Sequence, residues 1–478
     1  MDMNKLREAA SRLWNAETLP ALKTFVSRES LSTDFDPEWE KHGILTEVCR
    51  EAAAWGARML PGGTYDVQQE PGRTPALIFS VPGTGLYTGR EEDTVFFYGH
   101  LDKQPPATGW SEGLGPFTPV VRDGKLYGRG CSDDGYSVYA ALTAIRALED
   151  AGIPHPRAVG LIETREESGS NDLEHYLKKN AERFGSPRLV CVLDSGAGNY
   201  EQLWLTSSLR GACAIDLNVR VLRQGMHSGT ASGVVPSSFD VLRILLDRIQ
   251  DPRTGAILDP AFNVEIPANR MDDLKKTAEV LGDGFISEFP WAEGPNGAVQ
   301  SRCRGTVEAL IARCWKPTLS ITGAAGLPPL SMAGNSLRSE TTLRLSFRLP
   351  PTAKTENILP ALQKKLLTDP PFNAVVSIAG GDALPGWNAP AEADWFRSAC
   401  DESSKALWGK PAMRIGEGGS IPILNLFEAQ FPRAQFAVTG VLGPGSNAHN
   451  ADESLDIAYT EKFITAVGYL AASIPEEA

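Results

Sequence analysis

The sequence lacks the features that mark membrane, secreted and nucleic-acid-binding proteins. Its 478 residues contain no apolar run near the ~20 residues that span a bilayer. Its net charge of −13 lacks the basic excess that neutralises nucleic-acid phosphates. The seven cysteines are odd in number and contain no CxxC pair, which argues against a disulfide framework or a thiolate zinc site. Met1 to Glu17 has no apolar signal-peptide core, so we expect a soluble cytoplasmic protein that binds neither nucleic acid nor membrane.

Apolar residues make up 42% of the chain, which is enough for a large core and predicts a folded protein. At roughly 150 residues per domain, two or three domains are expected. In the first half, short apolar runs alternate with helical periodicity. We predict strands at 94–98, 159–162 and 189–193, and helices at 3–15, 37–60, 135–150 and 172–184. This alternation predicts an α/β fold whose mixed, mostly parallel sheet is flanked by helices.

Metal-ligating residue types follow these predicted strands. His100, Glu166, Glu167 and Asp194 come directly after apolar runs, and Asp133 precedes a predicted helix. In α/β sheets, ligands bind at the carboxyl ends of the strands. Carboxylates mixed with histidine suit zinc or manganese. Two metals need a bridging carboxylate, for which Asp133 is the natural candidate. The alternative for Asp133 and its neighbour Asp134 is capping of the helix N-terminus.

Three further carboxylates have predicted roles around such a site. Asp102 lies two residues from His100, on the same side of an extended segment, so it can orient the imidazole. Glu166 and Glu167 are adjacent, and in an extended segment their side chains point apart. One of them can then bind metal while the other acts as general base. The alternative is a solvated acidic turn.

The six histidines divide by their surroundings. Three lie in loops rich in glycine, serine or asparagine, namely His100, His227 and His449. The other three lie in polar or helical segments and are predicted to be solvated, namely His42, His155 and His175. The first group supplies the histidine ligands that a metal site needs.

The middle of the chain has a different pattern, with strands at 211–221, 317–322, 341–349 and 374–378 and helices at 236–249, 270–281 and 355–367. We predict an α+β lid or dimerisation domain over 211–387. It is inserted into a catalytic domain formed by 1–210 and 388–478. The segment 289–304 is predicted to be a long loop.

Seven motifs occur in a fixed order between residues 99 and 449. They are Gly99-His100-Leu101-Asp102, Tyr127 to Asp134, Glu166 to Ser170, Leu193-Asp194, His227-Ser228-Gly229, Glu417 to Pro422 and Ala448-His449. Together they resemble the co-catalytic zinc peptidase family of carnosine dipeptidase, carboxypeptidase G and acetylornithine deacetylase. The long middle segment resembles most the cytosolic nonspecific dipeptidase (carnosinase-like) branch.

The resemblance implies two divalent metal ions per subunit, zinc first and manganese or cobalt as alternatives. His100 and Asp194 would bind one ion, Glu167 and His449 the other, and Asp133 would bridge them. It also implies that Asp102 orients a ligand and that Glu166 is the general base.

The resemblance implies substrate contacts as well. Arg348 would grip the substrate carboxylate, since an arginine fork pairs bidentately with such a group. Asn335 and a loop of Gly418, Gly419 and Ser420 would line the pocket. His227 would polarise the scissile carbonyl in the active site of a partner subunit, so the resemblance implies a homodimer.

The chain departs from the family pattern at three places. Gly135 stands where the family often has lysine, and Asn335 to Arg338 replaces a Thr-Val-Ile-Pro-like stretch. The segment Gly386 to Pro390 lacks a histidine that the dipeptidase branch carries. None of these changes removes a predicted ligand, but each bears on substrate identity, and Arg338 can be an additional anion contact.

We therefore predict a metallopeptidase, most simply a dipeptidase, that hydrolyses the amide bond of a small substrate with a free carboxylate. One alternative keeps the chemistry and takes N-acyl or N-carbamoyl amino acids. Two others are a non-catalytic binding homologue and a cysteine nucleophile at Cys131.

Overall fold

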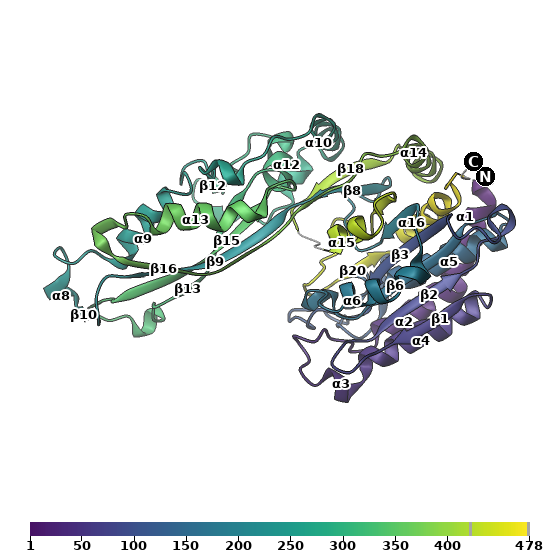
Figure 1. Cartoon of the computed structure of the whole chain (residues 1–478), viewed down its shortest axis with the longest axis horizontal. Helices are drawn as coiled ribbons and strands as arrows, with labels where there is room; N and C mark the ends of the chain where they lie inside the picture. The colour runs from purple at the N-terminus through teal and green to yellow at the C-terminus, as the bar shows by residue number, and fades with distance from the viewer. Residues whose placement is uncertain (420–422, 476–478) are drawn as a thin grey trace. The chain divides into compact units, whose positions relative to one another are not determined.

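The computed structural model describes residues 1–419 and 423–475, and these form two compact units (Figure 1). Unit 1 contains Met1–Thr206, Ala389–Ile415 and a last segment that begins at Ile423. Unit 2 contains Ser207–Asn388 and a short segment that begins at Gly416. Unit 2 is therefore inserted in the sequence of unit 1. In the described part of the chain, no helix is long and apolar enough to cross a membrane.

Unit 1 is built on a six-stranded sheet in the order β1-β2-β6-β3-β7-β19. The strands are β1 (Thr64–Gln68), β2 (Ala76–Val81), β6 (Arg157–Glu163), β3 (Thr94–His100), β7 (Leu189–Val192) and β19 (Gln435–Val438). The pairs β6–β3, β3–β7 and β7–β19 are parallel, whereas β1–β2 and β2–β6 are antiparallel. The predicted mixed, mostly parallel sheet is confirmed.

The central strand β3 shows why helices cover both faces of this sheet. All seven of its residues are buried, as expected for a strand in the middle of an α/β sheet. Successive side chains point to opposite faces. Phe96 packs against Phe184, Phe427 and Phe431, whereas Phe97 stacks on Phe79. Each face therefore has its own aromatic core.

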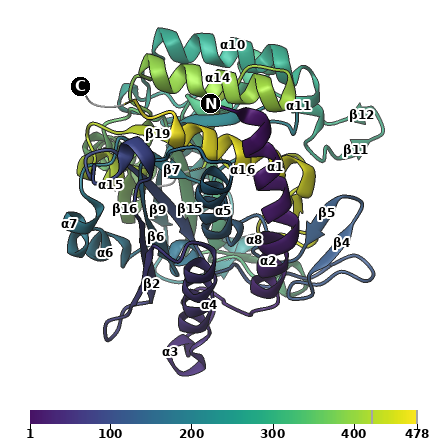
Figure 2. The same cartoon turned by 90° about the vertical axis from the view of Figure 1, so that its right-hand side faces the viewer.

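The helices of unit 1 are α1 (Met3–Leu13), α2 (Leu19–Val26), α3 (Trp39–His42), α4 (Ile44–Met59), α5 (Tyr136–Asp150), α6 (Leu173–Lys179), α7 (Ala181–Phe184), α14 (Asp394–Trp408), α15 (Ile423–Gln430) and α16 (Ile457–Ala472). Figure 2 looks onto the helical layer in which α1, α5 and α16 contact one another. Helix α5 is buried on almost every side and contacts β3. A small sheet adds β4 (Val120–Arg122), β5 (Lys125–Tyr127) and β20 (Ser454–Asp456).

Unit 2 contains a four-stranded antiparallel sheet covered on one face. Its order is β13 (Thr318–Ala325), β15 (Glu340–Leu349), β9 (Gly211–Arg220) and β16 (Val375–Leu384). Burial alternates along β9, so Cys213, Ile215, Leu217 and Val219 face the core while the other face is more exposed. Helices α9 (Ser238–Asp247) and α13 (Ile358–Leu367) contact the sheet and cover the buried face (Figure 1).

The remaining elements of unit 2 include one longer helix, α10 (Ala268–Leu281), and several short elements. Unit 2 also has α8 (Ser228–Ala231), α11 (Gly284–Ser287), α12 (Thr306–Cys314), β10 (Met226–His227), β11 (Glu293–Gly294), β12 (Gly297–Ala298) and β14 (Ser336–Leu337). A three-stranded sheet, in the order β17 (Trp387–Asn388), β8 (Trp204–Leu209) and β18 (Met413–Glu417), includes the strands in which the chain passes from one unit to the other.

Four predicted elements differ from the observed ones. The helix predicted over 172–184 is divided at Asn180 into α6 and α7. The helix predicted over 37–60 is divided at Gly43, which has a left-handed φ of 72° and ends α3. The helix predicted over 3–15 continues through a π-helical turn at Trp14–Thr18 into α2. The predicted loop 289–304 contains a small hairpin, β11–β12. Single glycines and two-residue strands leave little periodic signal in a sequence.

Candidate metal centre

Five side chains of unit 1 form two groups that could each hold a metal ion. One group is His100, Asp133 and Asp194, and the other is Asp133, Glu167 and His449. Within each group, one ligand atom per residue lies within 4.8 Å of the others. His100 ends β3 and Asp194 follows β7, so both lie at the carboxyl edge of the sheet. The loop between β19 and β20 carries His449.

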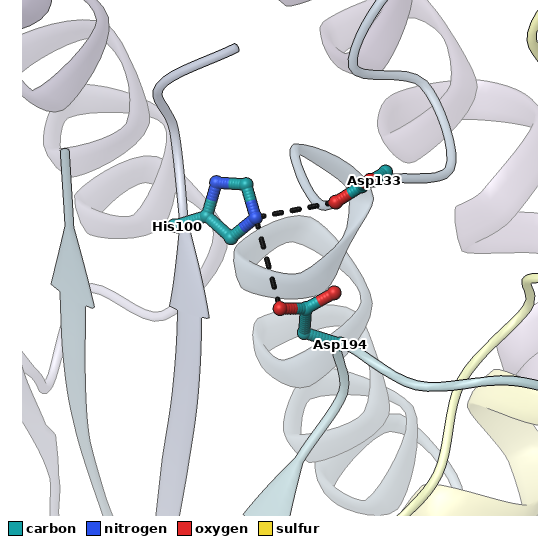
Figure 3. Close-up of side chains that lie close together, drawn as sticks. All are labelled: His100, Asp133 and Asp194. Atoms are coloured by element: carbon teal, nitrogen blue, oxygen red, sulfur yellow. Dashed lines mark ion pairs between the residues drawn. The ribbon is translucent and has the colours of Figure 1, made fainter. Parts of the chain in front are cut away.

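Asp133 belongs to both groups through different oxygens. Its Oδ1 lies 3.4 Å from His100 Nε2, and its Oδ2 lies 2.9 Å from His449 Nε2. Asp194 Oδ2 lies 3.8 Å from the same His100 nitrogen, as Figure 3 shows. Glu167 Oε2 lies 3.4 Å from His449 Nε2. One carboxylate that faces two ligand groups has the arrangement of a bridging ligand.

The contacts of His100 leave one of its ring nitrogens for a metal. Nδ1 lies 3.0 Å from the backbone oxygen of Asp102, to which it can donate, and 3.3 Å from the Asp102 carboxylate. Nε2 is fully buried, has no hydrogen-bond partner and points toward Asp133 and Asp194 (Figure 3). The contacts of Nδ1 hold the ring in place, and Nε2 lies between two carboxylates without a hydrogen-bond partner. Nε2 is therefore suited to bind a divalent cation. The residues present therefore fit the implied metal centre.

Electrostatics support the same interpretation. Burial, together with the charge of Asp133, raises the pKa of Asp194 to about 6. Burial and Asp133 likewise raise the pKa of Glu167 to about 10. Burial opposes ionisation of Asp133, but the neighbouring His100 and His449 rings outweigh this effect and lower its pKa. Clustered carboxylates repel one another when ionised, and a bound cation removes that repulsion.

Glu166 and Glu167 do not lie in the extended segment that we predicted. They begin a 3₁₀ turn, Glu166–Ser168, which Gly169 closes with a left-handed φ of 90°. The Asp102 carboxylate accepts the backbone N–H groups of Glu166 at 3.1 Å and Glu167 at 3.0 Å. These two bonds stabilise the turn, because a carboxylate favours free N–H groups at the start of a helical turn. Asp102 is thus in contact with both His100 and the Glu166–Glu167 turn.

The capping alternative for Asp133 and Asp134 is wrong. Helix α5 begins after Gly135, and no side chain caps its N-terminus. The Asp134 carboxylate instead accepts the backbone N–H of His100 at 3.2 Å. The cysteine-nucleophile alternative also fails, because Cys131 is fully buried, and burial raises the pKa of its thiol well above the usual value.

The predicted substrate residues of unit 2 form two separate groups. His227 and Asn335 are exposed neighbours, since Ser228 donates its N–H to the Asn335 oxygen at 2.9 Å and His227 pairs with Ser336. Arg348 lies on β15 opposite Ala212. Gly418 accepts a hydrogen bond from Arg210 Nε at 3.2 Å, Gly419 is exposed, and Ser420 lies outside the described residues.

Two further sequence interpretations can be checked. Gly135 has a steric cause in this chain, since a Cβ there would lie 1.9 Å from the Phe25 ring, where no side chain fits. The prediction that His155 is solvated is wrong. Its side chain is fully buried, and its Nδ1 lies 2.8 Å from the Pro156 oxygen.

Three residues that contact the proposed ligands or their turns have no predicted role. Gln104 donates a hydrogen bond to Glu167 Oε2 at 2.7 Å. Glu453 is fully buried, pairs with Arg129 and accepts N–H groups of the turn that carries Asp133. Arg129 stands inside a recognised motif, but Glu453 follows Asp452 in a polar loop, and nothing in the sequence shows which of the two is buried.

Comparison with known proteins agrees with this geometry. "Peptidase family M20/M25/M40" matches residues 96–474. The chain is 26% identical to a Cys-Gly metallodipeptidase of Schizosaccharomyces pombe over 473 residues, covering 96% of this chain and 95% of that one. It is also 26% identical to the Beta-Ala-His dipeptidase of Homo sapiens over 457 residues, covering 91% and 86%.

Solved structures show the same fold. Human carnosine dipeptidase 1 has a TM-score of 0.73 at 22% identity over 99% of both chains. A metallo-carboxypeptidase of Sulfolobus solfataricus has a TM-score of 0.75 at 21% identity, covering 96% of this chain and 100% of that one. The predictions of family and of a metal-dependent peptide-bond hydrolase are confirmed. The chain belongs to peptidase family M20/M25/M40 and is a metallopeptidase.

Proposed function

We propose that the protein is a dipeptidase that uses two metal ions to hydrolyse small peptides with a free carboxylate. The observation that carries this proposal is Asp133, whose two oxygens face two separate ligand groups. The printed names of the relatives, a Cys-Gly metallodipeptidase and a Beta-Ala-His dipeptidase, support a dipeptide substrate.

The five ligands divide between the two ions. His100 and Asp194 would hold one ion, Glu167 and His449 the other, and Asp133 both. A ligand set of two histidines and three carboxylates favours zinc, and manganese and cobalt can bind to the same ligand set. When bound, such a pair of ions lowers the pKa of water and polarises a carbonyl group.

Glu166 is the proposed general base. Its backbone is held by Asp102, and burial raises the pKa of its carboxyl group well above the usual value. A carboxylate with a raised pKa is a stronger base, so it can accept the proton of the attacking water and return it to the leaving amine. Asp102 positions both this turn and the His100 ring.

The proposed substrate contacts lie in unit 2. Arg348 would pair with the substrate carboxylate, and Gly418 and Gly419 would let the backbone approach the substrate closely. Ser420, outside the described residues, is proposed for the same loop. Asn335 and His227 would contact the other end of the substrate, and His227 would polarise the scissile carbonyl.

Geometry within unit 2 supports a homodimer in which His227 acts in the partner's active site. Arg348 pairs with Ala212 at one end of β15, and Glu340 pairs with Arg220 at the other end. Eight residue steps along the strand separate Arg348 from Glu340, or about 27 Å at ~3.4 Å per residue. His227 lies at the Glu340 end of β15. The Val221 N–H, one residue after Arg220, donates to the Ser339 oxygen next to Glu340. His227 belongs to β10, which pairs with β14 just before Ser339 (Figure 1). A dipeptide extends only about 7 Å, so one chain cannot place both side chains on it.

The proposed compartment is the cytoplasm. All seven cysteines are free, and six of them are buried. Free thiols in this number are typical of proteins in a reducing compartment.

Metal analysis combined with activity tests the proposal. Protein purified without chelator should contain about two metal ions per chain. Hydrolysis of Cys-Gly and of β-Ala-His should be lost on chelation and restored by zinc or manganese. Two ions with hydrolysis only of N-acyl or N-carbamoyl amino acids would replace the dipeptidase with the deacylase alternative. Failure to bind metal after reconstitution would contradict the ligand assignments.

A further inference from the structure

Arg129 and Glu453 form a buried ion pair in unit 1. Arg129 is 1% exposed and Glu453 is 0% exposed, and Arg129 Nη1 donates to Glu453 Oε2 at 2.7 Å. Burying two charges costs free energy unless further hydrogen bonds satisfy them. The further bonds of this pair therefore indicate which parts of the chain it holds in place.

The Glu453 carboxylate accepts several hydrogen bonds from the backbone of the turn that carries Asp133. Its Oε1 accepts the N–H groups of Gly130 at 3.0 Å, Ser132 at 3.2 Å and Asp133 at 3.4 Å. It also accepts the Ser132 hydroxyl at 3.2 Å. Several N–H groups directed at one anion fix the conformation of a turn. The orientation of the shared carboxylate thus depends on Glu453.

The Arg129 guanidinium reaches the loops of the two histidines. Its Nη2 donates to the backbone oxygen of Asn450 at 3.0 Å, one residue after His449. Its Nε donates to the backbone oxygen of Pro105 at 3.0 Å, in the segment that follows His100. The Arg129–Glu453 pair is therefore hydrogen-bonded to three segments. One follows His100 of the first group, one follows His449 of the second group, and one is the turn of Asp133, which belongs to both groups.

We propose that Arg129 and Glu453 are positioning residues that set the separation of the two metal groups. The inference rests on the proposed metal centre. Neither residue is one of the five ligands; the pair acts through the turn of Asp133 and the loop of His449. Loss of the Glu453 charge should release the Asp133 turn and leave the Arg129 guanidinium buried without its partner.

A matched pair of variants separates this role from general stability. Glu453→Gln removes one charge of the Arg129 pair. Glu392→Gln removes one charge of a less buried ion pair of unit 1, in which Arg414 Nε and Nη2 donate to Glu392 at 2.9 and 3.0 Å and Nη1 also donates to Asp401 at 3.0 Å. Both variants should lower the melting temperature. Only Glu453→Gln should weaken zinc affinity, by about 10- to 100-fold, the usual effect of removing a group that orients ligands.

Zinc affinity would be measured by competition with a chelator on the full chain, and the cobalt-substituted proteins would be compared by visible absorption. We expect an altered cobalt spectrum for Glu453→Gln and an unaltered one for Glu392→Gln. If Glu453→Gln does not fold, the double variant Arg129→Gln/Glu453→Gln leaves no unpaired buried charge and should show the same loss of affinity.

Wild-type zinc affinity and cobalt spectrum in a folded Glu453→Gln or double variant would overturn the positioning role. Equal losses of affinity in Glu453→Gln and Glu392→Gln would also overturn it. Failure of the wild-type chain itself to bind zinc or cobalt would instead overturn the proposed metal centre, so the two failures are distinguishable.

Discussion

The predicted functional residues of unit 1 and unit 2 are held in different ways. In unit 1, four of the five proposed ligands are buried at the side chain, and only His449 is about half exposed, at 53%. Each group of ligands is compact within one chain. In unit 2, His227 and Asn335 are exposed, and β15 separates them from Arg348.

This difference assigns separate tasks to the two units. The proposed ligands of unit 1 are held by contacts with Asp102, Asp134 and Glu453 of the same chain. Preorganised groups stabilise a transition state without the cost of ordering them during the reaction. The substrate contacts proposed for unit 2 are divided between the two ends of a strand, which is why we propose that a partner subunit completes the substrate site.

The largest effect should come from unit 1, at the general base. Glu166→Gln keeps the size of the side chain but cannot accept a proton. We expect kcat to fall about 10²- to 10⁴-fold, the range typical of general-base catalysis. Metal content, measured by elemental analysis, should remain at the wild-type value because Glu166 lies outside both ligand groups.

Its neighbour provides the control. Glu167→Gln replaces a proposed ligand, so it should lower metal content as well as kcat. Near-normal turnover of Glu166→Gln would remove Glu166 from the mechanism. Loss of metal in Glu166→Gln would show that the two glutamates have exchanged the roles proposed for them.

The next effect should come from unit 2 and tests whether the site is shared between subunits. His227→Ala and Glu166→Gln homodimers should each be nearly inactive. In a mixed dimer, the Glu166→Gln chain supplies His227 to the intact metal centre of the other chain, which restores one site of two. Random mixing makes about half of the dimers mixed, so roughly a quarter of wild-type activity should return.

The control for mixing is the double variant Glu166→Gln/His227→Ala. Mixed with His227→Ala, it supplies no intact His227 to the working metal centre and should restore nothing. No recovery in a verified dimer of His227→Ala with Glu166→Gln would contradict the action of His227 in trans. His227 would then have to be assigned a role other than contact with the substrate bound to the partner subunit.

The same contrast explains how much of the fold could be predicted. Apolar runs such as Thr94–Tyr98 are short but fully buried, so hydrophobicity alone identifies β3 and its parallel neighbours. The residues Thr64–Gln68 form β1 with much less burial, and no apolar run marked them. Edge strands and short elements such as β11 depend on tertiary pairing, which a single sequence does not display.

The candidate site was predictable where chemistry restricts residue type. Residue types after strands pointed to His100 and Asp194, and an aspartate before a helix pointed to Asp133, because few other side chains bind such metals. The conformation of Glu166 and Glu167 was not predictable, since it depends on Asp102, 64 residues earlier for Glu166. Glu453 was missed for the same reason: its partner Arg129 is 324 residues away in the sequence.

The smallest effect should be a pH dependence of stability in the metal-free protein. Burial, with the charge of Asp133, raises the pKa of Glu167 to about 10, far above its ordinary value of 4.5. A raised carboxyl pKa contributes stability that is complete below the ordinary value and is lost as the pH rises toward the folded value. The melting temperature of stripped protein should therefore fall between pH 5 and 10, by a few degrees per pH unit at most.

Added zinc should remove much of this slope, because a ligand carboxylate is deprotonated in the complex. The Asp216–Arg344 pair of unit 2 gives the opposite sign: the hydrogen bond from Arg344 lowers the pKa of Asp216, so its contribution is constant above pH 5. Scanning calorimetry between pH 5 and 10 measures how the melting temperature changes with pH in stripped and in zinc-loaded protein, with Glu167→Gln as the control. A slope that is equal in stripped wild type and stripped Glu167→Gln would show that the charge on Glu167 is not its source. A slope that is present in stripped wild type and is reduced both by zinc and by Glu167→Gln would assign this pH dependence to Glu167 in the candidate metal centre of unit 1.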